Sequence, residues 1–390
     1  MAEKIVVYGK KHVIVPVRFE RPGFGSRYIS PYRPDIDDGA FRRCNLPSSF
    51  NTPTDPGTRG AIVGVVQGQK IWVKIIREDI SSSMPLFVTS ADPQICEICN
   101  PRNNKKVASN GQFKIKGVSS TKEGNPVIHV RTGTIDGPII GELEVHVFRM
   151  KTIDVRVHLV KINSTSGGVG AAPTVTKADI TKRLKGINAI WRPFGISFKM
   201  KGNFSKPTVQ LAVRNKVDAS QGWAHELSEI KKILALGRAA DREKLINWYI
   251  VTTWNDNTLG IGFSRDSAAS SSVKPGIITS ESSPDHLENC HLFAHELGHF
   301  FRLWHPHNKQ YSPPGSNPAR DSVSCRQLMY PVNNATVNPK VANCGYGSNR
   351  PGSLLTIRRR YTNKPGKTSD GEYEIVKKCV RSGRGAQGWY

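Results

Sequence analysis

The first 150 residues carry the hydrophobic pattern of β-strands. Apolar residues alternate with polar ones or run together, and Gly, Asn, Asp and Pro stand between the runs. In the segment 139–150, Leu143 and Val145 would face one side of a sheet, and Glu142 and Glu144 the other. Short strands at regular spacing are typical of a β-sandwich. We expect strands at residues 11–19, 61–76, 111–118, 125–132 and 139–150.

From residue 151 onward, strand patterns alternate with helix patterns. Thr176 can cap a helix in which Ile180, Leu184 and Ile187 recur at helical spacing. Residues 246–254 are mostly apolar and predict a central strand. This alternation favours an α/β or α+β domain over residues 151–390. We expect helices at 176–195, 220–237 and 353–361, and strands at 152–162, 196–200, 246–254, 259–266 and 274–280.

The order of the segments GQFKIKGV, NPVIHVRT and GELEVHVF resembles the end of bacterial immunoglobulin-like domains. The resemblance implies an all-β, immunoglobulin-like sandwich over residues 1–150, acting as an accessory domain or a pro-domain. The chain of 390 residues is therefore expected to have two domains, the second beginning at residue 151.

The net charge of +25 is spread unevenly. Residues 1–150 hold 21 basic and 14 acidic side chains, whereas residues 151–390 hold 35 and 17. Such a charge attracts polyanions, either through a generic basic surface or through affinity for an anionic envelope component. No zinc-finger spacing or RNA-binding signature accompanies it, so specific nucleic-acid binding is not expected. No apolar run of about eighteen residues predicts a membrane span.

The most informative stretch is HLFAHELGHFFRLWHPH, residues 291–307. His295 and His299 are four apart, so on a helix their imidazoles lie on one face, and Glu296 follows the first. This H-E-x-x-H spacing is that of zinc peptidases, in which the histidines bind Zn²⁺ and the glutamate is the general base. A helix with ordinary surface histidines is the alternative. Ser283 would cap this helix.

The longer string HELGHFFRLWH, residues 295–305, resembles the metzincin signature H-E-x-x-H-x-x-G-x-x-H. The resemblance implies His305 as the third zinc ligand. The segment LMYP resembles the methionine turn of matrixins and implies Met329 beneath the metal. It covers about residues 152–360 and implies a metzincin-like zinc metallopeptidase domain that cleaves proteins or peptides.

Arg302 stands where the family has glycine, which costs about 1–2 kcal/mol if the turn needs positive φ. His307, His291 and Asp321 remain alternative ligands to His305. The family pairs substrate with an edge strand upstream of the metal helix, for which residues 259–266 are the candidate.

Two cysteine motifs carry weaker signals. Cys44 lies in RRCNLP, which resembles the matrixin segment whose cysteine covers zinc and keeps the peptidase latent; an ordinary loop cysteine is the alternative. Cys96 and Cys99 form C-x-x-C, which indicates a local disulfide, free thiols or a metal site.

We therefore expect a zinc endopeptidase, with a zinc hydrolase of peptidoglycan peptides or an inactive zinc-stabilised binding protein as alternatives. The N-terminus lacks the pattern of a Sec signal. Synthesis in the cytoplasm followed by a specialised export route would make the protein a bacterial effector or toxin, with a cognate inhibitor or immunity protein as partner.

Overall fold

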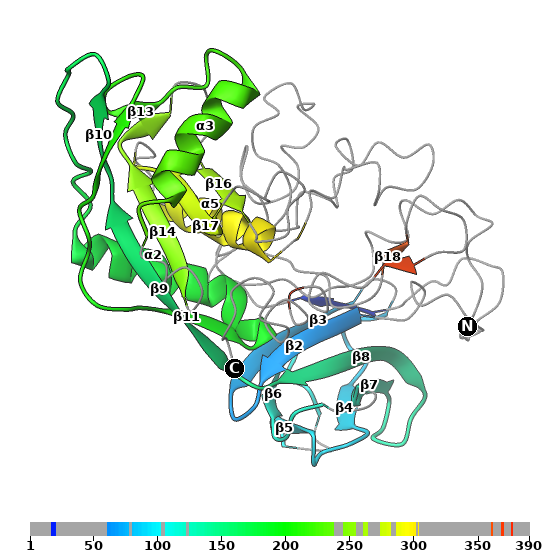
Figure 1. Ribbon diagram of the computed structural model, residues 1–390. Coiled ribbons are helices and arrows are strands. Elements are labelled where there is room, and N and C mark those ends of the chain that lie inside the picture. The colour runs from blue at the N-terminus through cyan, green and yellow to red at the C-terminus, as the bar shows by residue number, and fades with distance from the viewer. Residues whose placement is uncertain are drawn as a thin grey trace.

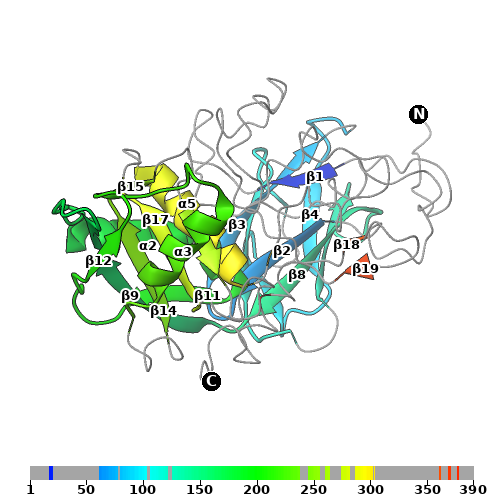
Figure 2. The same ribbon diagram turned by 45° about the horizontal axis from the view of Figure 1, so that its top comes forward.

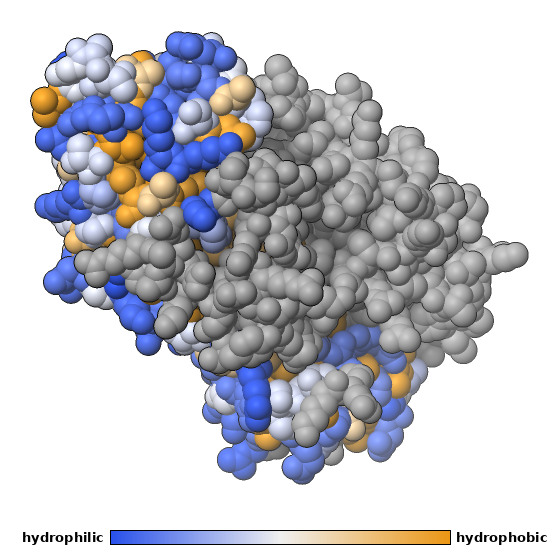
Figure 3. All heavy atoms as spheres, in the orientation of Figure 1, coloured by the Kyte–Doolittle hydropathy of each residue, from blue (hydrophilic) through white to orange (hydrophobic). Residues whose placement is uncertain are grey.

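The computed structural model describes most of the chain between residues 61 and 303. The described residues are 17–20, 61–77, 80–102, 106–121, 125–237, 245–254, 260–263, 274–281, 286–301, 303, 360–361, 368–369 and 376. Those within 17–148 form an N-terminal all-β part, blue to teal in Figure 1, and those within 151–303 form a mixed α/β part, green to yellow; Figure 3 shows the surface in the same orientation. None of the helices among them is long and apolar enough to span a membrane.

The N-terminal part consists of two four-stranded sheets that enclose one core. The first sheet has the order β1-β3-β6-β5 and the second β2-β8-β7-β4. Neighbouring strands are antiparallel except β2 and β8, which run parallel. The strands are β1 (Val17–Glu20), β2 (Ala61–Val66), β3 (Lys70–Arg77), β4 (Leu86–Ser90), β5 (Cys96–Asn100), β6 (Gln112–Gly117), β7 (Val127–Thr132) and β8 (Ile139–Phe148).

The expected strand over residues 61–76 is wrong as a single element. It is broken at residues 67–69, where Gly68 has a positive φ of 79°, and its halves β2 and β3 belong to different sheets. The other expected strands coincide with β1, β6, β7 and β8 within the described residues. The strands β4 and β5 were not expected from the sequence.

The second part is built on a five-stranded sheet with the order β11-β9-β14-β17-β16. The first four strands are parallel, and β16 is antiparallel to β17 at the sheet edge. The expected strand at 152–162 continues from β9 into β10, which leaves the sheet and pairs with β12. The strands are β9 (Lys151–Leu159), β10 (Lys161–Ser164), β11 (Ile196–Met200), β12 (Thr208–Leu211), β13 (Lys216–Val217), β14 (Ile246–Val251), β15 (Thr253–Trp254), β16 (Gly260–Phe263) and β17 (Gly276–Ser280).

Helices cover both faces of this sheet (Figures 1 and 2). The helices α2 (Lys177–Trp191) and α5 (His286–Phe300) pack on one face, and α3 (Trp223–Leu234) packs on the other. Strand β14 is buried along its whole length. Its Trp248 stacks on Phe293 of α5 at 3.9 Å between ring centroids, whereas Tyr249 donates its hydroxyl to the Leu234 carbonyl below α3. The expected central strand is confirmed over Ile246–Val251, whereas Thr253–Trp254 form β15 and pair with β13 in a separate sheet.

Helix α2 begins as its sequence predicts. The Thr176 hydroxyl accepts the Asp179 N–H at 3.2 Å, and the Asp179 carboxylate accepts the Thr176 N–H at 2.9 Å, so the first turn is closed by a capping box. The expected helix at 353–361 is wrong at its end, because Arg360–Tyr361 form β18 and pair with β19 (Thr368–Ser369). Residues 353–359 lie outside the described part.

The two parts share a packed junction. Only Arg149 and Met150 lie between β8 and β9. Phe148 packs on Phe194 of the short helix η2 (Arg192–Phe194) at 6.2 Å between centroids and belongs to the core of the second part. The Lys151 N–H donates to the Gly195 carbonyl at 2.7 Å. The N-terminal part is therefore joined to the second through shared core.

Candidate active site

The helix α5 carries the histidine motif and packs against the five-stranded sheet. Its residues Cys290, Phe293, Ala294 and Leu297 are fully buried against α2 and the sheet. This apolar stripe fixes the rotation of the helix, so that the motif residues face the edge of the sheet at β16. The expected cap Ser283 lies outside the described residues.

The structure brings His295 and His299 together. Their ring centroids lie 4.9 Å apart with an interplanar angle of 85°, and His295 is 7 % exposed. Two imidazoles one helical turn apart can bind the same ion.

The tautomer of His299 follows from its hydrogen bond. Nδ1 lies 2.8 Å from the Leu303 carbonyl, and a carbonyl only accepts, so Nδ1 carries the proton. The lone pair is then on Nε2. Burial lowers the pKa of His299, although this hydrogen bond opposes the shift. A neutral imidazole held by its second nitrogen is the form that binds metals.

Glu296 is a buried carboxyl beside these two rings. It is 5 % exposed, and burial raises its pKa to about 8, while a hydrogen bond from the Gly262 N–H opposes the rise. Its Oε2 has no hydrogen-bond partner in the described part of the chain. A buried polar atom without a partner is costly, and catalytic groups are among those in which it occurs. These residues therefore fit a metal site with an acid–base group beside it.

Two glycines of β16 let the edge strand approach α5. A Cβ atom on Gly262 would lie 2.2 Å from the Glu296 carbonyl oxygen, and one on Gly260 would lie 3.2 Å from the Glu296 Cγ. Alternate residues of a strand face the same side, so G-I-G presents both glycines to the helix. Glycine within a strand often marks such a close approach, and this signal was overlooked in the sequence.

A sequence profile now identifies the family. The model of the metallo-peptidase family M12B, reprolysin-like, matches residues 156–355. The chain belongs to this family. No curated protein sequence is significantly similar to it. Peptidases of family M12B are zinc-dependent, so this reprolysin-like protein is a zinc metallopeptidase, as expected.

Several expected site residues of the reprolysin-like domain lie outside the described residues. Within the described part, no group of three or more His, Cys, Asp and Glu side chains could hold a metal ion. His295 and His299 thus account for at most two protein ligands, and the assignment of a third stays a prediction. The side chain of His291 is not described. The remaining residues outside the description are Cys44, Arg302, His305, His307, Asp321 and Met329.

The C-x-x-C motif lies in β5 of the N-terminal part. Cys96 and Cys99 are free thiols, one of the alternatives that the sequence left open. Burial raises the pKa of Cys96 to about 12, so its thiol stays protonated at neutral pH.

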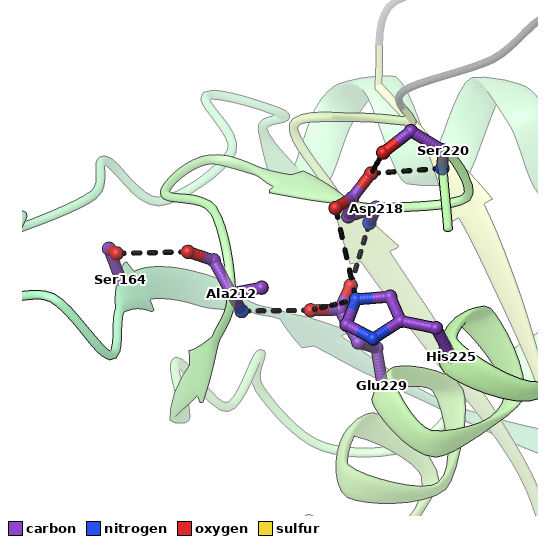
Figure 4. Close-up of polar contacts among 6 residues, drawn as sticks. All are labelled: Ser164, Ala212, Asp218, Ser220, His225 and Glu229. Carbon is purple, nitrogen blue, oxygen red and sulfur yellow. Dashed lines mark hydrogen bonds and ion pairs between the residues drawn. The ribbon is translucent and has the colours of Figure 1, made fainter. Parts of the chain in front are cut away.

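A second buried polar cluster lies beneath α3 (Figure 4). The Glu229 carboxylate accepts the Ala212 N–H at 2.8 Å and the Asp218 N–H at 2.6 Å. His225 Nε2 lies 3.8 Å from Asp218 Oδ2 and 3.7 Å from Glu229 Oε1. By accepting these two backbone N–H groups, the Glu229 side chain connects α3 to the segments that follow β12 and β13, which indicates a structural role.

Proposed function

We propose that this reprolysin-like enzyme is an endopeptidase in which His295, His299 and His305 hold zinc and Glu296 is the general base. The observation that carries the proposal is the placement of Glu296. It is a buried carboxyl beside two paired imidazoles, and one of its oxygens lacks a partner within the described residues.

The chemistry follows from the environment of this carboxyl. Zinc, when bound, supplies a Lewis acid that polarises the scissile carbonyl and lowers the pKa of water. Glu296 takes the proton of the attacking water and delivers it to the leaving amine. Burial raises the pKa of Glu296 to about 8. A bound cation lowers this value toward neutrality, where a group both accepts and releases protons.

We also infer that substrate aligns along β16. This strand is antiparallel to β17 at the sheet edge and lies against α5 through Gly260 and Gly262. An extended peptide that adds to an edge strand gains main-chain hydrogen bonds whatever its side chains are. The Gly262 bond to Glu296 then sets the distance between the bound peptide and the general base.

For the N-terminal part, the strand order supports an immunoglobulin-like fold. In their order across the sheet, β1, β3, β6 and β5 correspond to strands A, B, E and D of such a sandwich. The opposite sheet places β4, β7 and β8 as C, F and G, with β2 added in parallel to β8. We infer that this domain is an immunoglobulin-like accessory domain.

The roles are separated by two variants of the full chain. Glu296→Gln should keep zinc and lose nearly all cleavage of a peptide library, because a glutamine cannot take the proton. His299→Ala should lose zinc itself. Metal content after dialysis and cleavage rate are measured for both, and His129→Ala in the N-terminal part serves as the control for a histidine loss. Equal zinc loss in Glu296→Gln and His299→Ala would show that Glu296 is a ligand and that the proposed roles are wrong.

A further inference from the structure

The outer face of the β1-β3-β6-β5 sheet carries a cluster of lysines. In β3, Val73 and Ile75 point into the sandwich core, so Lys70, Trp72 and Lys74 point outward. In β6, Phe113 and Ile115 are fully buried, and Lys114 and Lys116 lie on the outer face. We call Lys70, Lys74, Lys114 and Lys116 the lysine face.

The strand register places these charges side by side. Lys70 is directly opposite Lys116, and Trp72 is directly opposite Lys114. The Lys114 Nζ lies 4.4 Å from the centroid of the Trp72 ring. Neighbouring strands are about 4.8 Å apart and alternate residues about 6.7 Å apart. The backbone positions that carry the lysine face are therefore spaced by roughly 5–7 Å across and along the sheet.

A second observation relates three of these lysines to Cys99. Burial raises the pKa of Cys99 on the neighbouring strand β5, and Glu97 adds to the rise, but Lys70, Lys116 and Lys114 each oppose it. The cysteine therefore lies within electrostatic reach of three lysines of this face.

This arrangement sets two lysines, Lys70 and Lys116, directly opposite each other. Like charges directly opposite each other on a sheet are destabilising. Lys116 has a carboxylate partner, Glu97, at 3.8 Å, but their side chains are 35 % and 49 % exposed, so the pair contributes little. In the strand register, Glu20 of β1 is opposite Lys74 and Glu97 of β5 is opposite Lys116, so the four lysines outnumber the carboxylates opposite them. An anionic partner would offset the repulsion.

We propose that the lysine face is a docking surface for an anionic polysaccharide. Charge complementarity sets the sign of the partner, and four lysines on two neighbouring strands fit a linear chain of acidic sugars. Trp72 disfavours single-stranded nucleic acid, because binding there relies on aromatic faces open to bases, and the Lys114 ammonium covers one face of this ring. It also disfavours a membrane, because Trp72 is half-buried and its ring contacts the Lys114 ammonium.

Docking at this face would position the peptidase. Phe148 and Ile62 belong to the core of the second part, so the sandwich and the zinc domain move together. A polysaccharide held at β3 and β6 would keep the active site near proteins attached to the same polymer. The surface is a property of the N-terminal part and does not depend on which residues bind zinc.

The test uses heparin as the polysaccharide probe and the zinc-loaded full chain. The variant K70Q/K114Q/K116Q removes three charges from the lysine face. The matched control K177Q/K182Q/K185Q removes three exposed charges from α2 of the other part. At about 0.15 M ionic strength, we expect the face variant to bind heparin about tenfold more weakly. The control should change the affinity by less than about twofold, because long-range charge is screened beyond about 8 Å.

Two further measurements keep the result interpretable. Urea midpoints show whether the variants fold. If the triple variant does not fold, K70Q/K116Q replaces it, because this double variant leaves the Lys114–Trp72 contact intact. Oligo(dT) and vesicles of phosphatidylglycerol are titrated in parallel. Equal losses of heparin affinity in face and control variants would overturn the proposal, because generic charge would then explain binding. So would no heparin binding by the wild type, or a face-specific loss confined to oligo(dT) or to vesicles.

Discussion

The backbone N–H of Gly262 donates to the carboxylate of Glu296. An edge strand of the sheet is thereby bonded directly to the residue that we propose as the general base. The same glycine has no room for a side chain, since its Cβ would lie 2.2 Å from the Glu296 carbonyl oxygen. The spacing between β16 and α5 is thus closest at this position.

Gly262→Ala should therefore separate the strand from the helix. We expect a loss of about 1–3 kcal/mol in the free energy of unfolding, as for other overpacked sites. We also expect a fall in kcat with zinc content unchanged, because the bond to Glu296 would be lost while the histidines stay on α5. Gly168→Ala is the control, since its Cβ would meet mainly the flexible side chain of Arg214. Unchanged kcat and stability in Gly262→Ala would contradict the close approach.

Glu229 should contribute strongly to stability, although it lies outside the histidine motif at residues 295–299. Glu229→Ala leaves the N–H groups of Ala212 and Asp218 without their acceptor, and hydrogen bonds to charged groups contribute about 1.5–3 kcal/mol each. Glu229→Gln keeps one acceptor oxygen and should lose less. Chemical denaturation measures both, with Lys232→Ala on the exposed side of α3 as the control. Similar stabilities for Glu229→Ala and the control would show that the hydrogen bonds of Glu229 do not stabilise the fold.

The capping box of α2 should make stability depend on acid pH. Hydrogen bonds from the Thr176 side chain and backbone lower the pKa of Asp179, so the ionised form is favoured in the folded state. Its contribution is present above the ordinary pKa of 3.8 and is lost as pH falls through the lowered value. Asp179→Ala should cost about 1 kcal/mol at neutral pH. The difference from wild type should shrink below pH ~3.8, whereas that of Lys182→Ala should not, as urea titrations at several pH values would reveal.

The third zinc ligand can be identified from its neighbours. His305→Ala should reduce zinc affinity by several orders of magnitude, because a site with two protein ligands is far weaker than one with three. His307→Ala should leave zinc affinity close to wild type. Competition with a chromogenic chelator measures both. The reverse ranking would show that His307, and not His305, is the third zinc ligand.

Local patterns in the sequence predicted much of the fold. Thr176 and Asp179 predicted the start of α2, and the apolar run at 246–254 predicted a strand buried on both faces. The division of residues 61–76 between two sheets was missed, because the choice of partner strand is made by distant residues of β6 and β8. The pairing of His295 with His299 follows from helix geometry, whereas the contact of Gly262 with Glu296 joins segments more than thirty residues apart and has no local signature.

The junction at Phe148 bears on how the N-terminal domain could regulate the enzyme. A pro-domain that is removed by cleavage must leave behind a surface that tolerates water. Here a cut at residues 149–150 would sever β8 from β9 and take Phe148 and Ile62 out of the core that surrounds Phe194. The exposed apolar surface would favour aggregation of the released fragment over its activation. The two parts share one core, so we expect control of this peptidase to act on the intact chain.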